Sequence, residues 1–277
     1  NRMLKQRLIT AAILIPLVVW AIFASSLVTF TTLIAAVAIL AAWEWHQMIG
    51  IKSPTMRVML VIDLIVVLYL AITQINPYFV ISIGIIIWLL ATLTILAYSN
   101  NSLSERLSYL FKNKIFGAIS SILILTVFVV SAVTLKTFSE TGAFLFFFVM
   151  VTVWLADTGG YFAGKRFGQH ALARSVSPNK TWEGVAGAIV LASIWAAAFY
   201  SVTSPSTITW FEWMLISIAT VASSIIGDLF ESLYKRAFSV KDSGNLLPGH
   251  GGILDRIDSL LAAVPIFTFL ILIMGSV

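Results

Sequence analysis

The sequence contains no cysteine, and charged residues are scarce. Without cysteine the chain can form neither a disulfide nor a thiolate metal site, and its redox compartment stays open. Asp, Glu, Lys and Arg make up only 10% of the residues, whereas a typical soluble domain contains about 25%. Hydrophobic residues account for 60%, which is more than a soluble globule of this size can bury. The composition therefore excludes an ordinary soluble domain and favours a lipid bilayer as the surroundings.

Long apolar runs recur along the whole chain. A helix needs about 20 mostly apolar residues to cross about 30 Å of hydrocarbon, and reading for such runs gives about nine. The pattern predicts an all-α polytopic integral membrane protein with about nine transmembrane helices, of which the sixth is the shortest. The predicted spans are residues 8–25, 27–43, 56–73, 78–98, 115–136, 142–157, 184–202, 208–229 and 257–275.

The net charge of +5 is best explained by membrane topology. A basic chain can indicate nucleic-acid binding, but here long apolar spans separate the Lys and Arg residues, and no nucleic acid is expected as a partner. All of these residues except Lys136 lie before the first span or in the even-numbered loops. Because Lys and Arg hold loops in the cytoplasm, we expect a multi-pass protein of the inner (plasma) membrane. Its N-terminus is predicted to be cytoplasmic and its C-terminus outside.

Polar residues are concentrated in the second half of the chain. Residues 1–140 are interpreted as transmembrane scaffold helices, and residues 141–277 as helices whose two cytoplasmic loops form a catalytic site. Within the scaffold half, Glu44 and His46 are flanked by tryptophans and are interpreted as part of an interfacial belt. Asp63 lies inside the third span, where an acid is a functional candidate.

Two pairs of acids flank the loop between the eighth and ninth predicted spans. Asp228 and Glu231 are three residues apart near the end of the eighth span, and Asp255 and Asp258 have the same spacing at the start of the ninth. Side chains spaced in this way share a helix face. Buried carboxylates are costly unless they are paired or bind a cation. An all-oxygen set of ligands favours a hard cation such as Mg²⁺.

Basic residues and glycines are interleaved with these acids. Acids for a metal beside bases for phosphate oxygens are what nucleotidyl and phosphoryl transfer require. The alternative is a set of surface salt bridges, which explains Lys241 and Asp242 equally well. A glycine-rich loop before Asp255 can bring backbone amides to an anion, although such loops are also common as simple turns. The residues concerned are Lys235, Arg236, Lys241 and Arg256, with His250, Gly251 and Gly252 in the glycine-rich loop.

The other polar loop is predicted to start at Asp157. Ser177-Pro178 predicts a turn, and Thr181 can cap a helix that begins near Trp182. The N-terminus of that helix, with Lys180 beside it, is a candidate anion site. A capped helix with an interfacial tryptophan explains the same residues as well.

The stretch from Ser232 to Asp258 resembles the signature of the CDP-diacylglycerol synthases, also called phosphatidate cytidylyltransferases. Tyr234 departs from it, because the signature has an aliphatic residue or Phe there. The segment from Ser177 to Gly184 is similar to a second conserved segment of that family. The matching positions are Ser232, Lys235-Arg236, Lys241-Asp242, Gly244, Leu247-Pro248, His250-Gly251-Gly252, Asp255-Arg256 and Asp258.

The resemblance implies that CTP and phosphatidic acid react to give CDP-diacylglycerol and pyrophosphate. It also implies a homodimer, a cytoplasm-facing site open to lipid, and Mg²⁺, and it leaves open a second, monovalent cation such as K⁺. By matching position, Asp228 and Asp255 are implied as metal ligands supported by Asp258. The catalytic residues are then Asp228, Asp255, Lys235 and Arg256. The implied substrate-binding residues are Ser177, Asn179, Lys180, Arg236, Lys241, His250, Gly251 and Gly252.

Three other functions are alternatives to this one. A cation-coupled transporter would suit membrane carboxylates, but its site is expected near mid-bilayer on broken helices. A lipid or polyprenol kinase would leave a nucleoside diphosphate and no pyrophosphate. A structural scaffold gives no reason for the His-Gly-Gly and Asp-Arg-x-Asp cluster.

Overall fold

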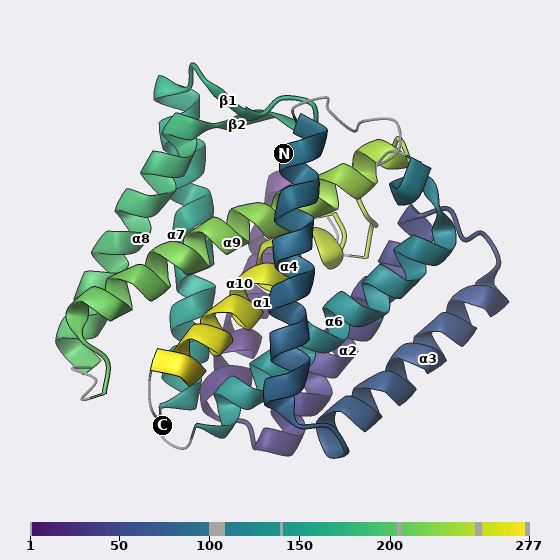
Figure 1. Ribbon diagram of the computed structural model, residues 1–277, viewed down its shortest axis with the longest axis horizontal. Helices are drawn as coiled ribbons and strands as arrows, with labels where there is room; N and C mark the ends of the chain where they lie inside the picture. Colours follow the sequence, from purple (N-terminus) through teal and green to yellow (C-terminus); the bar gives the residue numbers. More distant parts are fainter. Residues whose placement is uncertain (1, 100–108, 139–140, 204–206, 247–250, 275–277) are drawn as a thin grey trace.

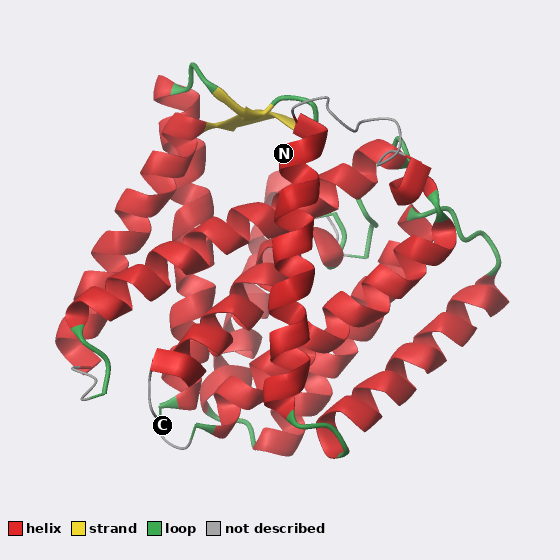
Figure 2. Ribbon diagram, in the orientation of Figure 1, coloured by secondary structure: helices red, strands yellow, loops and turns green. Residues whose placement is uncertain are grey.

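Helices make up most of the described chain in the computed structural model (Figure 1, Figure 2). The structure describes all residues except 1, 100–108, 139–140, 204–206, 247–250 and 275–277, and for residues 2–11 it describes the helical backbone alone. The helices are α1 Arg2–Phe23, α2 Leu27–Met48, α3 Pro54–Thr73, α4 Pro77–Ser99, α6 Lys114–Thr137, α7 Gly142–Phe167, α8 Trp182–Thr203, α9 Trp210–Ala237 and α10 Leu254–Met274. A short antiparallel hairpin, β1 Ala171–Ala173 and β2 Ser177–Thr181, joins α7 to α8.

Eight helices in the described part of the chain, α2 to α4 and α6 to α10, are long and apolar enough to cross a membrane. In α1, the stretch Ala12–Phe23 is apolar but shorter. The prediction of an all-α polytopic membrane protein is confirmed. Each predicted span overlaps one helix, while the count of nine and the orientation of the termini stay predictions.

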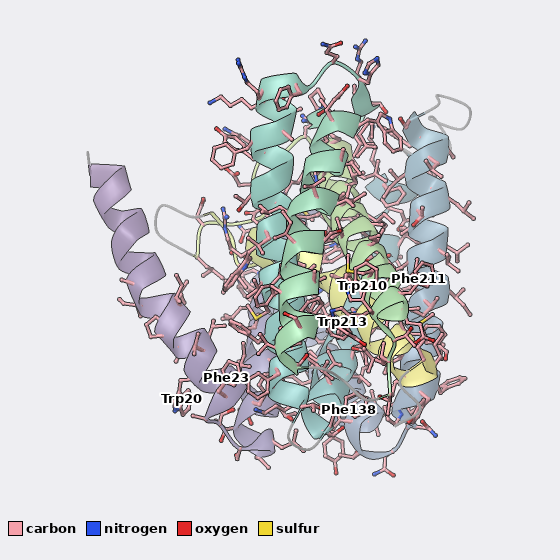
Figure 3. All side chains as sticks on the ribbon, turned by 90° about the vertical axis from the view of Figure 1, so that its left-hand side faces the viewer. Trp20, Phe23, Phe138, Trp210, Phe211 and Trp213 are labelled. Atoms are coloured by element: carbon pink, nitrogen blue, oxygen red, sulfur yellow. The ribbon has the colours of Figure 1, made fainter. Side chains whose placement is uncertain are left out.

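The loops that the charge pattern assigns to one side of the membrane contact one another. Lys114 Nζ donates to the carbonyl of Gly50 at 2.7 Å, which joins the second loop to the fourth. Ser175 Oγ donates to the carbonyl of Tyr98 at 3.4 Å, which joins the fourth loop to the sixth. In Figure 3, α1 begins on the side of the bundle that carries the hairpin, and α10 ends toward the other side. These contacts agree with an alternating path of the spans.

The sixth span is longer than predicted, because α7 continues ten residues beyond the predicted end at Asp157. The glycines of this stretch are therefore not loop residues. A Cβ on Gly159 would lie 2.5 Å from the carbonyl oxygen of Gly187 on α8, so the backbones of the two helices touch. Small residues permit such close approach between membrane helices, and Figure 1 shows α7 and α8 side by side with the hairpin across one end.

The expected turn at Ser177-Pro178 is also wrong. Ser177 pairs with Ala173 as the first residue of β2, and the turn precedes it. The residue before a proline prefers extended backbone, which suits a strand. The predicted cap is confirmed, because Thr181 Oγ1 accepts a hydrogen bond of 3.1 Å from the N–H of Gly184 in the first turn of α8.

The eighth span is extended in the same way as the sixth. Helix α9 runs unbroken for 28 residues to Ala237, so Asp228 and Glu231 lie on one helix and share a face, as predicted. Helix α10 begins at Leu254 and carries Asp255 in its first turn.

Four aromatic rings hold the helices of the second half together. Phe148 of α7 lies 4.6 Å from Trp213 of α9 and 5.7 Å from Phe267 of α10, measured between ring centroids. Phe199 of α8 stacks on Trp213 at 5.6 Å. Such pairs stabilise packing by about 0.5–1.5 kcal/mol each beyond the area they bury. Trp213 lies within the bundle in Figure 3, and this cluster fixes the helices whose ends carry the acids.

We expect the substitution Gly159→Ala to destabilise the protein, because the added methyl group would overlap the backbone of α8. Overpacking of this kind costs about 1–3 kcal/mol, which should appear as a lower unfolding temperature in detergent. The matched control is Gly160→Ala, where the nearest atom to the new Cβ lies at 3.6 Å. Equal unfolding temperatures for the two variants would contradict the close contact of α7 with α8.

Candidate active site

A hollow of about 410 Å³ opens between the ends of α7, α9 and α10 and the strand β2. Apolar side chains line it together with acids, a lysine and hydroxyl groups. The polar residues that line it are Asp157, Tyr161, Ser177, Asn179, Lys180, Thr181, Asp228, Asp255, Asp258 and Ser259.

Three acids of the two predicted pairs, Asp228, Asp255 and Asp258, line this hollow together. Their approach depends on Gly227, where α9 crosses α10. A Cβ on Gly227 would overlap the carbonyl oxygen of Asp258 and would lie 3.2 Å from Cα of Ser259. Only glycine lets the two backbones come this close, and the contact places Asp228 beside Asp258.

Each of the two lysines of the site is paired with acids. Lys180 of β2 forms an ion pair with Asp228. Lys235 forms one with Glu231, four residues earlier on α9, and a second with Asp255 of α10 at 2.6 Å. The side chains of Lys235 and Asp255 are 17% and 10% exposed. Carboxylates withdrawn from water to this extent require such partners, so the lysines hold the acids of α9 and α10 at one place.

The carboxylate of Asp255 is also held by the loop that precedes α10. It accepts hydrogen bonds from the N–H groups of Gly252 at 2.8 Å and of Ser243 at 3.2 Å. Gly251 has a φ of +82°, a left-handed conformation that favours glycine. The glycines therefore bend the chain around Asp255, and the N–H of Gly252 points at this acid. Substrate binding by Gly251 and Gly252 stays a prediction.

The other predicted residues fall into two groups. Ser177, Asn179 and Lys180 line the hollow from β2. Arg236 and Lys241 instead line a second hollow of about 600 Å³. Lys235 also lines this second hollow, and its ammonium group contacts Asp255 of the first, so it joins the two.

Arg236 contacts the hairpin as well as the second hollow, because its Nε donates to the carbonyl of Val176 at 3.1 Å. Arg256 is absent from both linings but lies close enough to Asp157 to attract it. His250 lies outside the described residues.

Asp157 is a site residue to which the sequence pattern assigned no role. It lines the hollow from α7 and lies within electrostatic reach of Lys180 and Asp228. The signal for it was present, because an acid at the end of an apolar run is a functional candidate. The wrong end of the sixth span concealed it by placing Asp157 in a loop.

Oxygen atoms are the donors that this site offers to a metal. Within the described ranges, no three His, Asp or Glu side chains are arranged to hold an ion by themselves. A Mg²⁺ ion needs only one or two protein carboxylates when substrate phosphates complete its shell. The acids lining the hollow fit that requirement.

Glu44 and His46 do not form an interfacial belt, and that interpretation is wrong. Their exposed fractions are 1% and 0%, because this end of α2 packs against α6 and the start of α10. His46 Nε2 lies 2.9 Å from Ser121 Oγ, and Glu44 Oε2 accepts a 2.9 Å hydrogen bond from the N–H of Leu254. Asp63 is exposed on α3 and does not line the hollow.

The sequence of the whole chain has known relatives. Residues 5–274 match the model of the cytidylyltransferase family. The phosphatidate cytidylyltransferase of Haemophilus influenzae is 37% identical over 289 aligned positions, covering 96% of this chain and 98% of the relative. The chain belongs to the cytidylyltransferase family. The phosphatidate cytidylyltransferase of Pseudomonas aeruginosa is 39% identical and covers 97% of each chain. That of Bacillus subtilis is 42% identical over 139 residues, about half of each chain.

Family membership confirms the resemblance seen in the signature stretch. In this cytidylyltransferase the stretch begins on α9, contributes Lys235 and Arg236 before that helix ends, and finishes with Asp258 on α10. The signature therefore encloses the crossing of two helices and the loop that joins them.

We expect Gly227→Ala to reduce catalysis while the protein still folds. The added Cβ would push α9 away from α10 and displace the acids, and a misplacement of about 1 Å can cost about 100-fold in rate. The measurement is turnover of purified protein with its substrates, alongside its unfolding temperature.

The control for this variant is Ser224→Ala on the same helix. The Ser224 hydroxyl donates to the carbonyl of Val221 within α9, so its loss should leave turnover near that of the unaltered protein. Full activity of Gly227→Ala would show that the site tolerates separation of the two helices.

Proposed function

We propose that this protein is a phosphatidate cytidylyltransferase, a nucleotidyltransferase that converts CTP and phosphatidic acid into CDP-diacylglycerol and pyrophosphate in phospholipid biosynthesis. The observation that carries the proposal is the single hollow in which Asp228 and Asp255 meet, each paired with a lysine. Its place in a bundle of apolar helices suits an enzyme with one water-soluble and one lipid substrate. Two relatives that align over nearly the whole chain bear this name.

The reaction depends on stabilising the negative charges of the reactants more than on proton transfer. An oxygen of the phosphatidate phosphate attacks the α-phosphorus of CTP and forms a new P–O bond. The bond from that phosphorus to the bridging oxygen breaks, and its electron pair leaves with pyrophosphate. The attacking oxygen is already anionic, so no strong base is needed. Both reactants are negatively charged, so positioning and electrostatic stabilisation supply the catalysis.

The lysines can serve acids and substrates together. A lysine ammonium carries three N–H donors, so Lys180 and Lys235 can each keep a carboxylate partner and still donate to a phosphate oxygen. Lys235 stands between the two hollows, where it can contact the α-phosphate. Arg236 and Lys241, in the second hollow, supply the positive charge that the departing pyrophosphate needs.

Asp228 and Asp255, with Asp258 in support, are the proposed carboxylate ligands of Mg²⁺. When bound, the cation neutralises part of the triphosphate charge. Asp157 in the hollow and Glu231 beside Lys235 keep Lys180 and Lys235 within reach of the substrates through their negative charge.

The proposed location follows from the substrates. The protein is a multi-pass membrane protein, and we place it in the inner membrane with the hollow facing the cytoplasm, where CTP is available. The side chains of Val185, Ala188 and Ile225 give the hollow an apolar wall next to its acids, which suits a lipid whose phosphate must reach polar groups. A homodimer remains the expected assembly.

The function is tested with purified protein in mixed micelles that contain phosphatidic acid and Mg²⁺. CTP should release pyrophosphate and form CDP-diacylglycerol, ATP and GTP should release far less, and EDTA should stop the reaction. A nucleoside diphosphate as product would support a lipid kinase instead. Solute flux without consumption of nucleotide would support a transporter, and either result would overturn the proposal.

Asp255→Asn should lower turnover at least about 100-fold, because the amide removes a negative charge from the site and leaves Lys235 without that partner. Incorporation of labelled CTP into lipid in proteoliposomes measures the loss. The matched control is Asp63→Asn, which alters an exposed acid away from the hollow and should retain near-normal turnover. Near-normal turnover of Asp255→Asn would remove this acid from the mechanism.

A further inference from the structure

A buried acid of the scaffold half reaches the catalytic loop. Glu44, near the end of α2, is 1% exposed, and its Oε2 accepts the N–H of Leu254 at 2.9 Å. The two residues are 210 positions apart in the chain, and Leu254 is the first residue of α10. A charged side chain buried this deeply is rare unless it is specifically paired, so the contact requires an explanation.

Glu44 takes the place of a helix cap. The first N–H groups of a helix have no partner within it, and Ile253, which precedes α10, has an apolar side chain that cannot accept a hydrogen bond. The carboxylate of Glu44 accepts in its place and adds a negative charge at the end of the helix where negative charge is favourable. The N–H groups of Leu246 and Ile253 also point at this carboxylate.

The loop before α10 is shaped around Glu44. A Cβ on Gly244 would overlap Oε1 of Glu44, and a Cβ on Gly252 would lie 2.6 Å from Oε2. Both glycines belong to the signature stretch, and their lack of a side chain is what admits the carboxylate. Gly252 in turn donates its N–H to Asp255 at 2.8 Å, so one residue links Glu44 to the catalytic acid.

We propose that Glu44 is a positioning residue for Asp255: its carboxylate fixes the loop and the first turn of α10, so that Asp255 faces Lys235 and the hollow. The proposal rests on the proposed function for its kinetic part only, because the ordering of the loop can be measured without substrates. Among the described residues, none that lines the hollow is hydrogen-bonded to Glu44. Glu44 therefore acts through Gly252 and Leu254.

The first test uses the full-length protein in detergent, without nucleotide or lipid, and the variants Glu44→Gln and Ser121→Ala. The Ser121 hydroxyl bonds His46 at the same end of α2, so its removal disturbs the same region but not the loop. Amide hydrogen exchange in residues 251–256 should accelerate about tenfold or more in Glu44→Gln and stay unchanged in Ser121→Ala. Unchanged exchange in Glu44→Gln would overturn the proposal.

The kinetic arm compares kcat with KM for the same proteins. Misplacement of a catalytic acid should lower kcat about tenfold or more with little change in KM for CTP, whereas Ser121→Ala should match the unaltered protein. Accelerated exchange with a normal kcat would also overturn the proposal, because loosening the loop would then have no effect on the work of Asp255. An inactive unaltered protein would instead refute the proposed function and leave the exchange result standing.

A third measurement tests the same contact from the glycine side. Alone, Gly244→Ala should strongly reduce the protection of the loop against amide exchange, because its methyl group would overlap the Glu44 carboxylate. In a Glu44→Ala background that overlap is gone, so adding Gly244→Ala should cost less than about twofold further in loop protection. Equal losses in both backgrounds would show that the glycine is not there to admit Glu44.

Discussion

The structure depends on carboxylates that cannot remain unpaired at the ends of apolar helices. Asp228 and Asp255 arrive from different helices and are withdrawn from water, and each is compensated by a lysine. Removing such charges from water costs several kcal/mol per ion unless a partner is present. The pairs therefore do two things together. They make the partly buried acids tolerable, and they bring four basic and acidic groups to one place where anionic substrates can be received.

Close helix packing makes this pairing possible. The crossing of α9 and α10 at Gly227 and the contact of α7 with α8 at Gly159 both bring backbones into touch. In lipid, helices gain little from hydrophobic association and rely on such packing. The aromatic cluster around Trp213 then locks the same four helices farther from the site. The positions of the acids are thus set by the packing of the helices and not by the loops alone.

The sequence predicted the architecture well because the bilayer imposes a strong length and polarity signal on each span. It failed at the ends of the sixth and eighth spans, where Asp157 and Asp228 made helical residues look like the start of a loop. Polarity marks the edge of the hydrocarbon, but a helix continues past that edge when another helix supports it. Gly159 was assigned to a loop for the same reason. In a soluble chain a glycine there would indicate a turn, but in this membrane bundle it marks a contact between two helices.

For the site, spacing along one helix was readable and contacts between distant segments were not. Asp228 and Glu231 share a face because their separation fixes it, and Asp255 follows the loop directly. Glu44 could not be placed, because nothing in its neighbourhood shows that this end of α2 packs on α10. A tryptophan on each side made it look like a residue of the membrane interface. Only the folded chain reveals that it is enclosed.

The bond between α2 and the start of α10 has a consequence for how such chains can diverge. A hybrid that takes its first helices from one relative and its signature stretch from another combines the two sides of this contact from different parent proteins. A longer or shorter acid would no longer fit the space that two glycines leave. Substitution at this point of the scaffold is therefore constrained by a loop about two hundred residues later in the chain. A substitution on either side of the contact requires a compensating substitution on the other.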